Sequence, residues 1–369
     1  MFIIRFSEGV SLTFSKTAGV VTTTMEPEAD YVFTAAQYAW LKNQPCSKVI
    51  TRTSRALTRV RNFVAAESNP GESLLFFAGA GGYGDQLLAA PAAALLARRG
   101  YAVTVATDPG NVACWSYPWM KGALTFPMKL ADFMAFEHHA IFEFVTNCDE
   151  HQGQLHPVDS LLFRLGIDHE RVAPADKVLA PWLTPEELTL AAQFAGGRRL
   201  AFYQLGGSGD KRRLLPEPSR RLFLSLAEHI PELHWIGLGD SHIKQYMDPL
   251  PFDAPPNAEI HEFGSLRILF ALVSQCCVAV GIDSVLMHAA GAFGRPFVGL
   301  WGPLAPDLRM RYYKNQTVIW NKSCPKAPCL HYRGGFDECP PVARSVGMCL
   351  CFKDIDSNAV VGAVREAIA

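Results

Sequence analysis

Apolar and polar positions alternate differently along the chain and divide it into three zones. In the first zone, residues 2–6, 11–14 and 19–24 are rich in β-branched and aromatic side chains and are separated by glycines. Such runs predict short β-strands. Residues 33–44 and about 54–67 instead have a helical pattern. We therefore predict a β-rich and helical N-terminal extension over residues 1–70.

The second zone opens with a continuous apolar run at residues 74–78 that ends in glycines, as a buried parallel strand does. A Gly-rich turn, an Ala- and Leu-rich segment up to Gly100, and a further apolar run at 102–107 follow. This order predicts a βαβ unit. Less regular patterns indicate a strand near 123–128 and a helix near 156–165. Residues 71–195 are thus predicted to form a Rossmann-like domain.

A second set of βα repeats occupies residues 196–369. Strands are predicted at 200–205, 233–238, 278–282 and 297–300, and helices at 217–230, 266–277 and 284–293. Two α/β halves predict a ligand cleft at the carboxyl ends of both sheets.

Composition narrows the class of protein. The 369 residues suit two or three domains, and a hydrophobic fraction of 49% excludes a disordered chain. With 34 Lys and Arg against 35 Asp and Glu, the protein is not uniformly basic. No apolar run approaches the roughly 18 residues of a membrane span, and the start lacks the features of a secretory signal. We expect a cytoplasmic protein, in which ten cysteines would not form structural disulfides.

The segment 280–303 carries the most specific chemistry. Asp283 ends a predicted strand, and Ser284 is a suitable N-cap for the helix that follows. Backbone N–H groups at such a helix start can bind phosphate, and Ser284 and His288 could add side-chain donors. An ordinary βα junction with a capping serine is the alternative interpretation.

Two further turns carry candidate residues. In 203–216, Gly206, Gly207 and Ser208 permit close backbone approach, and Lys211 and Arg212 supply positive charge; a basic surface turn would look the same. In 81–86, Asp85 stands at a helix start, where a carboxylate can accept a proton or simply cap the helix. Asp108 could mimic the acidic residue of a nicotinamide-binding site, but a clean dinucleotide fingerprint is lacking.

Together these segments resemble the family 9 glycosyltransferases, the ADP-heptose-dependent heptosyltransferases of bacteria, over about residues 74–305. The resemblance is carried by Gly84-Asp85, by the turn Gly206–Ser208 with Lys211, and by Asp283, Ser284, His288, Ala290, Pro296, Gly302 and Pro303. It implies a GT-B fold of two Rossmann-like domains facing a cleft, with the sugar nucleotide on the C-terminal half and the acceptor on the N-terminal half.

The same resemblance implies roles for individual residues. Asp85 would be the general base of an inverting transfer, and Lys211 would neutralise charge on the leaving diphosphate. Asp283 would hold sugar hydroxyls or ribose, and no catalytic Mg²⁺ is expected. Gly206, Gly207, Ser208, Arg212, Ser284 and His288 would complete the donor site.

Five of the ten cysteines lie within one Pro- and Gly-containing stretch inside residues 321–352: Cys324, Cys329, Cys339, Cys349 and Cys351. Four thiolates on such a loop suit a tetrahedral metal site, with zinc or iron as the metal, although the spacing is not that of a common zinc motif. Buried free cysteines are the alternative. Which of Cys349 and Cys351 would bind stays open, and His331 could substitute.

The cysteines and the β-rich extension together resemble the bacterial autotransporter heptosyltransferases. That subgroup carries a four-cysteine iron-binding finger, modifies Ser hydroxyls of adhesin proteins and assembles as rings. The resemblance implies iron, a protein Ser or Thr acceptor and a homo-oligomer.

A basic stripe suggests other acceptors. Arg52, Arg55 and Arg59 fall at helical spacing in a stretch without acidic residues. They form either a solvated helix face or a surface for an acidic acceptor, such as phosphorylated lipopolysaccharide core or DNA with hydroxymethylated bases. Tyr38 and Trp40 lie nearby. A sugar-nucleotide-binding protein without turnover remains a further alternative.

Overall fold

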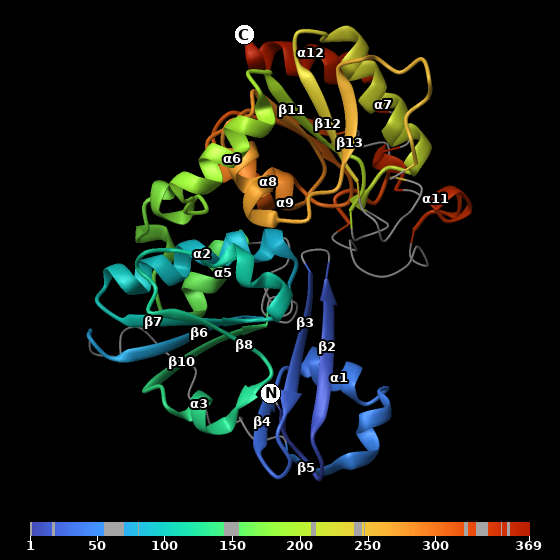
Figure 1. Cartoon of the computed structure of the whole chain (residues 1–369). Coiled ribbons are helices and arrows are strands. Elements are labelled where there is room, and N and C mark those ends of the chain that lie inside the picture. Colours follow the sequence, from blue (N-terminus) through green and yellow to red (C-terminus); the bar gives the residue numbers. More distant parts are fainter. Residues whose placement is uncertain are drawn as a thin grey trace. The chain divides into compact units, whose positions relative to one another are not determined.

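The computed structural model describes residues 2–16, 19–54, 70–79, 81–143, 155–207, 212–239, 246, 248–320, 324–329, 339–347, 349–352 and 355–369 (Figure 1). Contacts divide the chain into two compact units, residues 1–151 with 157–177 and residues 152–156 with 178–369. No helix in these described stretches combines the length and apolar character that crossing a membrane requires.

The first unit begins with β-strands, as the sequence predicts, and the structure shows that they pair antiparallel. Among the described residues, one sheet has the order β5 (Ile50–Ser54), β1 (Phe2–Phe6), β4 (Asp30–Phe33), β9 (Met128–Lys129), and β2 (Val10–Lys16) pairs with β3 (Gly19–Met25) in a hairpin. The helix expected at 33–44 is α1 (Ala35–Leu41), which Thr34 caps by accepting the N–H of Gln37. A 3₁₀ turn, η1, spans Pro45–Val49.

One prediction in this region is wrong. Arg52 lies in β5, opposite Arg5 of β1, and not on a helix face with Arg55 and Arg59. The β-branched residues Ile50, Thr51 and Thr53 favour an extended backbone, and β1 offers a strand to pair with. Residues 55–69 lie outside the described residues, as does the side chain of Arg52.

The βαβ unit of the second zone is confirmed. Parallel strands have the order β10 (His138–Glu143), β6 (Ser73–Gly79), β7 (Ala102–Thr107), β8 (Gly122–Thr125) in the described part of the unit. Helix α2 (Tyr83–Arg98) connects β6 to β7, and its alanines and leucines are buried almost throughout. The 3₁₀ helix η2 (Pro109–Cys114) follows β7, and α3 (Leu130–Met134), α5 (Pro157–Arg164) and the short turns η4 (His169–Arg171) and η5 (Pro174–Lys177) complete the unit.

The second unit is built on a parallel sheet. In the described residues its order is β13 (Ala258–His261), β12 (His234–Leu238), β11 (Leu200–Gln204), β14 (Val278–Gly281), β15 (Phe297–Trp301), β16 (Gln316–Trp320). Its helices are α6 (Pro185–Ala195), α7 (Pro216–His229), α8 (Leu266–Val273), α9 (Val285–Ala292), α10 (Asp307–Met310), α11 (Pro341–Val346) and α12 (Ser357–Ile368), with the 3₁₀ turn η8 (Leu350–Phe352).

Helices cover this sheet because its strands are apolar on both faces. Ala201 and Tyr203 of β11 point to the face where Phe223 of α7 and Val364 of α12 join one buried cluster, and the two helices pack on each other (Figure 1). The residue between them on the strand, Phe202, is fully buried and points to the opposite face. Near-continuous apolar strands of this kind are typical of parallel sheets.

Candidate functional site

The strand order of the second unit reverses beside β11. Strands β12 and β13 lie on one side of β11 and β14 lies on the other, so this is the topological switch point where open α/β sheets form a crevice. The turn Gly206–Gly207 after β11 and the residues Asp283 and Ser284 after β14 therefore meet at one edge. The structure thus brings together two segments that the sequence predicts to bind a donor.

The two strand ends approach closely. A Cβ atom on Gly281 would lie 2.7 Å from Cβ of Gln204, so only glycine fits at this end of β14. Ser284 occupies the N-cap position of α9, but its side chain makes no capping bond there and its Oγ lies 3.5 Å from Oε1 of Gln204. The expected serine is in place, and its hydroxyl links the two segments instead of closing the helix end.

Asp283 is the centre of a buried charge cluster. Its side chain is 8% exposed, and its carboxylate faces Nε2 of His288 at 3.4 Å, Nη1 of Arg212 at 3.3 Å and Nε of Arg309 at 3.8 Å. Burial alone would raise the pKa of Asp283. The hydrogen bond of His288 and the charges of Arg309 and Arg212 outweigh it and hold that pKa well below its usual range. The carboxylate is therefore ionised, with the guanidinium groups of Arg212 and Arg309 and the imidazole of His288 around it.

His288 is held in turn by Tyr313, whose hydroxyl lies 2.9 Å from Nδ1 of the imidazole. The imidazole is 4% exposed, which makes it part of the buried support of Asp283 and not a surface group. Sequence reasoning missed Arg309 and Tyr313. Both lie in the stretch that follows Gly302-Pro303. The basic and aromatic residues of that stretch could have indicated that it contributes to the site.

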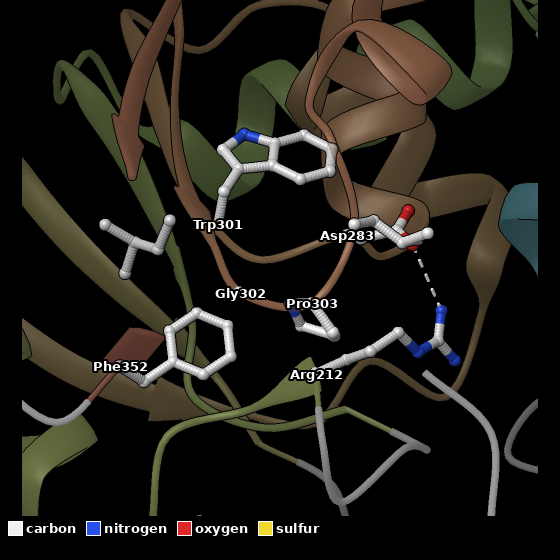
Figure 2. A pocket seen from close by; sticks show the side chains of 8 residues that line it. Arg212, Asp283, Trp301, Gly302, Pro303 and Phe352 are labelled. Carbon is white, nitrogen blue, oxygen red and sulfur yellow. Dashed lines mark hydrogen bonds and ion pairs between the residues drawn. The ribbon is translucent and has the colours of Figure 1, made fainter. Parts of the chain in front are cut away.

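A small pocket opens beside this cluster (Figure 2). It lies at the carboxyl end of β15, and the residues labelled around it are Arg212, Asp283, Trp301, Gly302, Pro303 and Phe352. The pocket therefore brings Asp283, Gly302 and Pro303 of the family pattern together with Arg212 and Phe352, which come from other segments of the second unit.

In the first unit, Asp85 lies at the carboxyl end of β6, in the first turn of α2. Its Oδ2 accepts the backbone N–H of Gly82 at 2.8 Å, so the carboxylate caps the helix. Nearby, Asn111 donates to the carbonyl of Gly81, and Gln86 accepts from Nε1 of Trp115. Asp85 is only partly buried. The capping interpretation is thus observed, and a carboxylate in this role still has lone pairs to accept a proton.

Several predicted site residues fall outside the described residues. These are Ser208 and Lys211 of the donor turn and Arg55 and Arg59 of the basic stripe.

The structure brings four of the five cysteines near one another. Cys324, Cys349 and Cys351 are buried in the main apolar cluster of the second unit. The thiols of Cys349 and Cys351 share a hydrogen bond, the backbone of Cys324 reaches the Cys351 thiol, and the charge of Cys329 acts on Cys349. The bond to Cys349 lowers the pKa of Cys351 to about 7. That bond, together with burial, raises the pKa of Cys349.

These thiols do not form a ready-made metal cage. Among the described residues, no three His, Cys, Asp or Glu side chains make a group that could hold a metal ion. Cys339 is partly buried and lies just before α11.

Comparison with known proteins identifies this part of the chain. Residues 264–338 match the model of Glycosyltransferase family 9 (heptosyltransferase). The matched segment contains Asp283, Ser284 and His288. The resemblance drawn from the motifs is thereby confirmed. No curated protein matches the sequence.

Solved structures resemble the chain in fold. A family 9 glycosyl transferase from Veillonella parvula has a TM-score of 0.59 at 13% identity, covering 81% of this chain and 97% of its own. The iron-containing dodecameric glycosyltransferase TibC from enterotoxigenic E. coli has a TM-score of 0.54 at 13% identity, with 83% and 79% covered. TibC in complex with ADP-D-beta-D-heptose gives 0.54 at 11% identity, with 100% and 94% covered. The chain shares the α/β fold with parallel sheets of these enzymes.

Proposed function

We propose that the chain is a family 9 glycosyltransferase that transfers heptose from ADP-heptose to a Ser or Thr hydroxyl of an acceptor protein. One observation carries the proposal. Four residues of the family pattern lie together at the switch point of the second unit, namely Gly206, Gly207, Asp283 and Ser284, and Arg212, Arg309 and His288 surround Asp283 there. The choice of donor is supported by TibC, whose fold resembles this chain and which forms a complex with ADP-D-beta-D-heptose.

The residues divide the reaction between them. Asp85 removes the proton of the acceptor hydroxyl, whose oxygen forms a bond to the anomeric carbon while the bond from that carbon to the diphosphate oxygen breaks. Lys211 and Arg212 neutralise the charge that gathers on the leaving diphosphate. Gly206, Gly207, Ser208, Ser284 and His288 complete the donor site, and Asp283 fixes the sugar or ribose. No catalytic Mg²⁺ takes part in this scheme.

The cysteine loop is proposed to hold iron or zinc. Thiolates are ligands that both metals accept. The thiols of Cys349 and Cys351 share a hydrogen bond, and the Cys329 thiol and the backbone of Cys324 lie near them. Cys339 is the fifth candidate. The bound metal would supply a structural cross-link between the two ends of the loop. Iron is favoured because TibC is described as iron-containing. Elemental analysis of the purified chain tests this: about one metal per chain supports the site, and a metal-free folded protein contradicts it.

The acceptor is tested by intact-mass analysis. Candidate adhesin proteins, lipopolysaccharide core and DNA with hydroxymethylated bases are each incubated with ADP-heptose and the enzyme, with the Asp85→Asn variant as the control. A mass gain of one heptose on the protein supports the proposal. A mass gain on lipopolysaccharide or DNA would instead identify that molecule as the acceptor. No transfer to any of them favours a sugar-nucleotide-binding protein without turnover.

We also propose that the chain self-associates, because of its resemblance to TibC. TibC is described as dodecameric, so this chain is expected to form a homo-oligomer. Light scattering of the purified protein gives the mass, and a monomer at working concentration would contradict the expectation.

A further inference from the structure

The turn Gly302-Pro303 ends β15 beside Asp283 and lines the pocket (Figure 2). Its two carbonyl oxygens are bonded from segments far along the chain. Nε1 of Trp320 donates to the Gly302 carbonyl at 3.0 Å, and the backbone N–H of Cys329 donates to the Pro303 carbonyl at 2.9 Å. The backbone of this turn is therefore fixed from outside its own strand.

A third contact comes from Phe352. A Cβ atom on Gly302 would lie 2.6 Å from the Phe352 ring, so the ring packs directly on the bare backbone of the glycine. Phe352 is only 3% exposed, and Figure 2 shows its ring beside Gly302 at the pocket. Because the ring fills the space that a Cβ would need, the position of Phe352 sets the position of the turn.

Two of the three contacts come from residues 324–352, which carry the five cysteines, and the third comes from Trp320 just before them. Cys329 is itself one of the five cysteines, and Phe352 follows Cys351 and donates its N–H to the carbonyl of Cys349 at 2.9 Å. Trp320 ends β16, four residues before Cys324, and its indole also reaches the Cys351 thiol. Residues in and next to the cysteine-bearing segment 324–352 thus hold the Gly302-Pro303 turn in place.

We propose that Phe352 and Trp320 are positioning residues of the donor site, which hold the Gly302-Pro303 turn where it can receive the nucleotide diphosphate. The inference rests on the proposed function, since it assumes that this pocket belongs to the donor site. Neither residue has to touch the reacting atoms. Their effect passes through the turn, whose misplacement by about an ångström can lower the efficiency of a site severely.

The test compares Phe352→Ala with Phe352→Leu, using titration calorimetry with ADP on the full chain. The alanine removes the ring under Gly302, and we expect the Kd for ADP to rise roughly tenfold. The leucine refills most of the space and should bind ADP within about threefold of the unmodified chain. Val342→Ala, at an exposed position of α11, is the matched control and should bind normally. The KM for the donor should rise with Kd while kcat at saturating donor changes little.

Trp320→Phe provides an independent arm that does not depend on the folding of the alanine variant. It keeps an aromatic ring but removes the N–H that bonds the Gly302 carbonyl and reaches the Cys351 thiol, so ADP affinity should again fall. If both Phe352→Ala and Trp320→Phe lose thermal stability but bind ADP like the unmodified chain, the residues are merely structural and the inference is overturned. An unmodified chain that binds none of ADP, UDP or GDP overturns the proposed function instead.

Discussion

At the scale of single residues, Asp85 combines two demands on one carboxylate. Its Oδ2 caps α2 through the N–H of Gly82, and the proposed chemistry needs the same group as a base. An asparagine keeps an oxygen that can accept the Gly82 N–H but cannot take up a proton at neutral pH. The substitution Asp85→Asn therefore separates the cap from the base.

We expect Asp85→Asn to lower kcat by at least roughly 10²-fold while the melting temperature and the Kd for ADP stay close to those of the unmodified chain. Steady-state transfer assays and calorimetry measure these quantities. Asp132→Asn, an exposed residue in the first turn of α3, serves as the control. Transfer at the full rate by Asp85→Asn would remove Asp85 from the mechanism and leave it as a helix cap.

Asp283 poses a different problem, because its carboxylate is buried among His288, Arg212 and Arg309. Asp283→Asn removes the buried negative charge that pairs with Arg212 and Arg309, and we expect a loss of about 3 kcal/mol in stability at neutral pH. The exposed Asp307→Asn should change stability by less than about 0.5 kcal/mol.

The loss of stability caused by Asp283→Asn should become smaller in strong acid. The pKa of Asp283 is depressed in the folded chain, so its contribution is fully present above the unfolded pKa of about 3.9 and is lost as the pH falls toward the depressed value. The difference in melting temperature between the unmodified chain and Asp283→Asn should therefore be constant above about pH 5 and shrink in stronger acid. A difference that grows on acidification would contradict the ion cluster.

At the scale of elements, helix α6 begins with a capping box in the sequence, and a contact with α8 strengthens it. Thr184 accepts the N–H of Glu187, and Glu187 accepts the N–H of Thr184. The Glu187 carboxylate also pairs with Arg267 of α8 at 2.6 Å, which lowers its pKa. The capping box therefore begins α6, and the ion pair of Glu187 with Arg267 holds α6 against α8.

Thr184→Ala removes the capping oxygen and should destabilise the second unit by about 1 kcal/mol, which lowers its melting temperature by roughly 2–4 °C. Thr184→Ser keeps an oxygen at the same place and should restore most of the difference. Differential scanning calorimetry measures both variants. Equal melting temperatures for Ala and Ser would show that the pair of Glu187 with Arg267 suffices to begin the helix.

Elements with a strong local pattern were predictable, and others were not. Strands β6, β7, β11 and β14 and helices α2 and α7 follow from their apolar runs and glycine breaks. Strand β5 was missed because Arg52 lies in a stretch whose charges also fit a helical period, and only pairing with β1 decides the matter. Strand β16 lacks a clean alternation, and its pairing with β15 makes it a strand.

At the scale of the whole molecule, the residues of the candidate site were likewise predictable only where they lie within one local sequence pattern. Asp283, Ser284 and His288 lie within one short segment, so their pattern is visible in the sequence. Arg309 and Phe352 reach the same pocket region from later segments, and no local period connects them to Asp283. Residues joined by strand order and by loop packing could be assigned only once the sheet of the second unit was known.

The two units also differ in where a diphosphate can bind. In the first unit, a nicotinamide dinucleotide would place its pyrophosphate at the start of α2, where the Asp85 carboxylate already caps the backbone and would repel it. In the second unit, Ser284 leaves the start of α9 without a side-chain cap, and Arg212 and Arg309 lie beside it. These contacts support the proposal that a nucleotide diphosphate binds to the second unit.

Thermal shift with matched nucleotides tests this preference on the intact chain. ADP at about 100 times its Kd should stabilise by about 2.7 kcal/mol, which raises the melting temperature by roughly 5–10 °C, whereas NAD at the same concentration should leave it unchanged. Arg212→Gln should weaken the ADP shift, because it removes a cation next to Asp283, and the exposed Arg171→Gln on η4 is the charge-matched control. A larger shift with NAD than with ADP would move the nucleotide to the first unit and favour a nicotinamide enzyme, since the Asp85 carboxylate would then not exclude a pyrophosphate there.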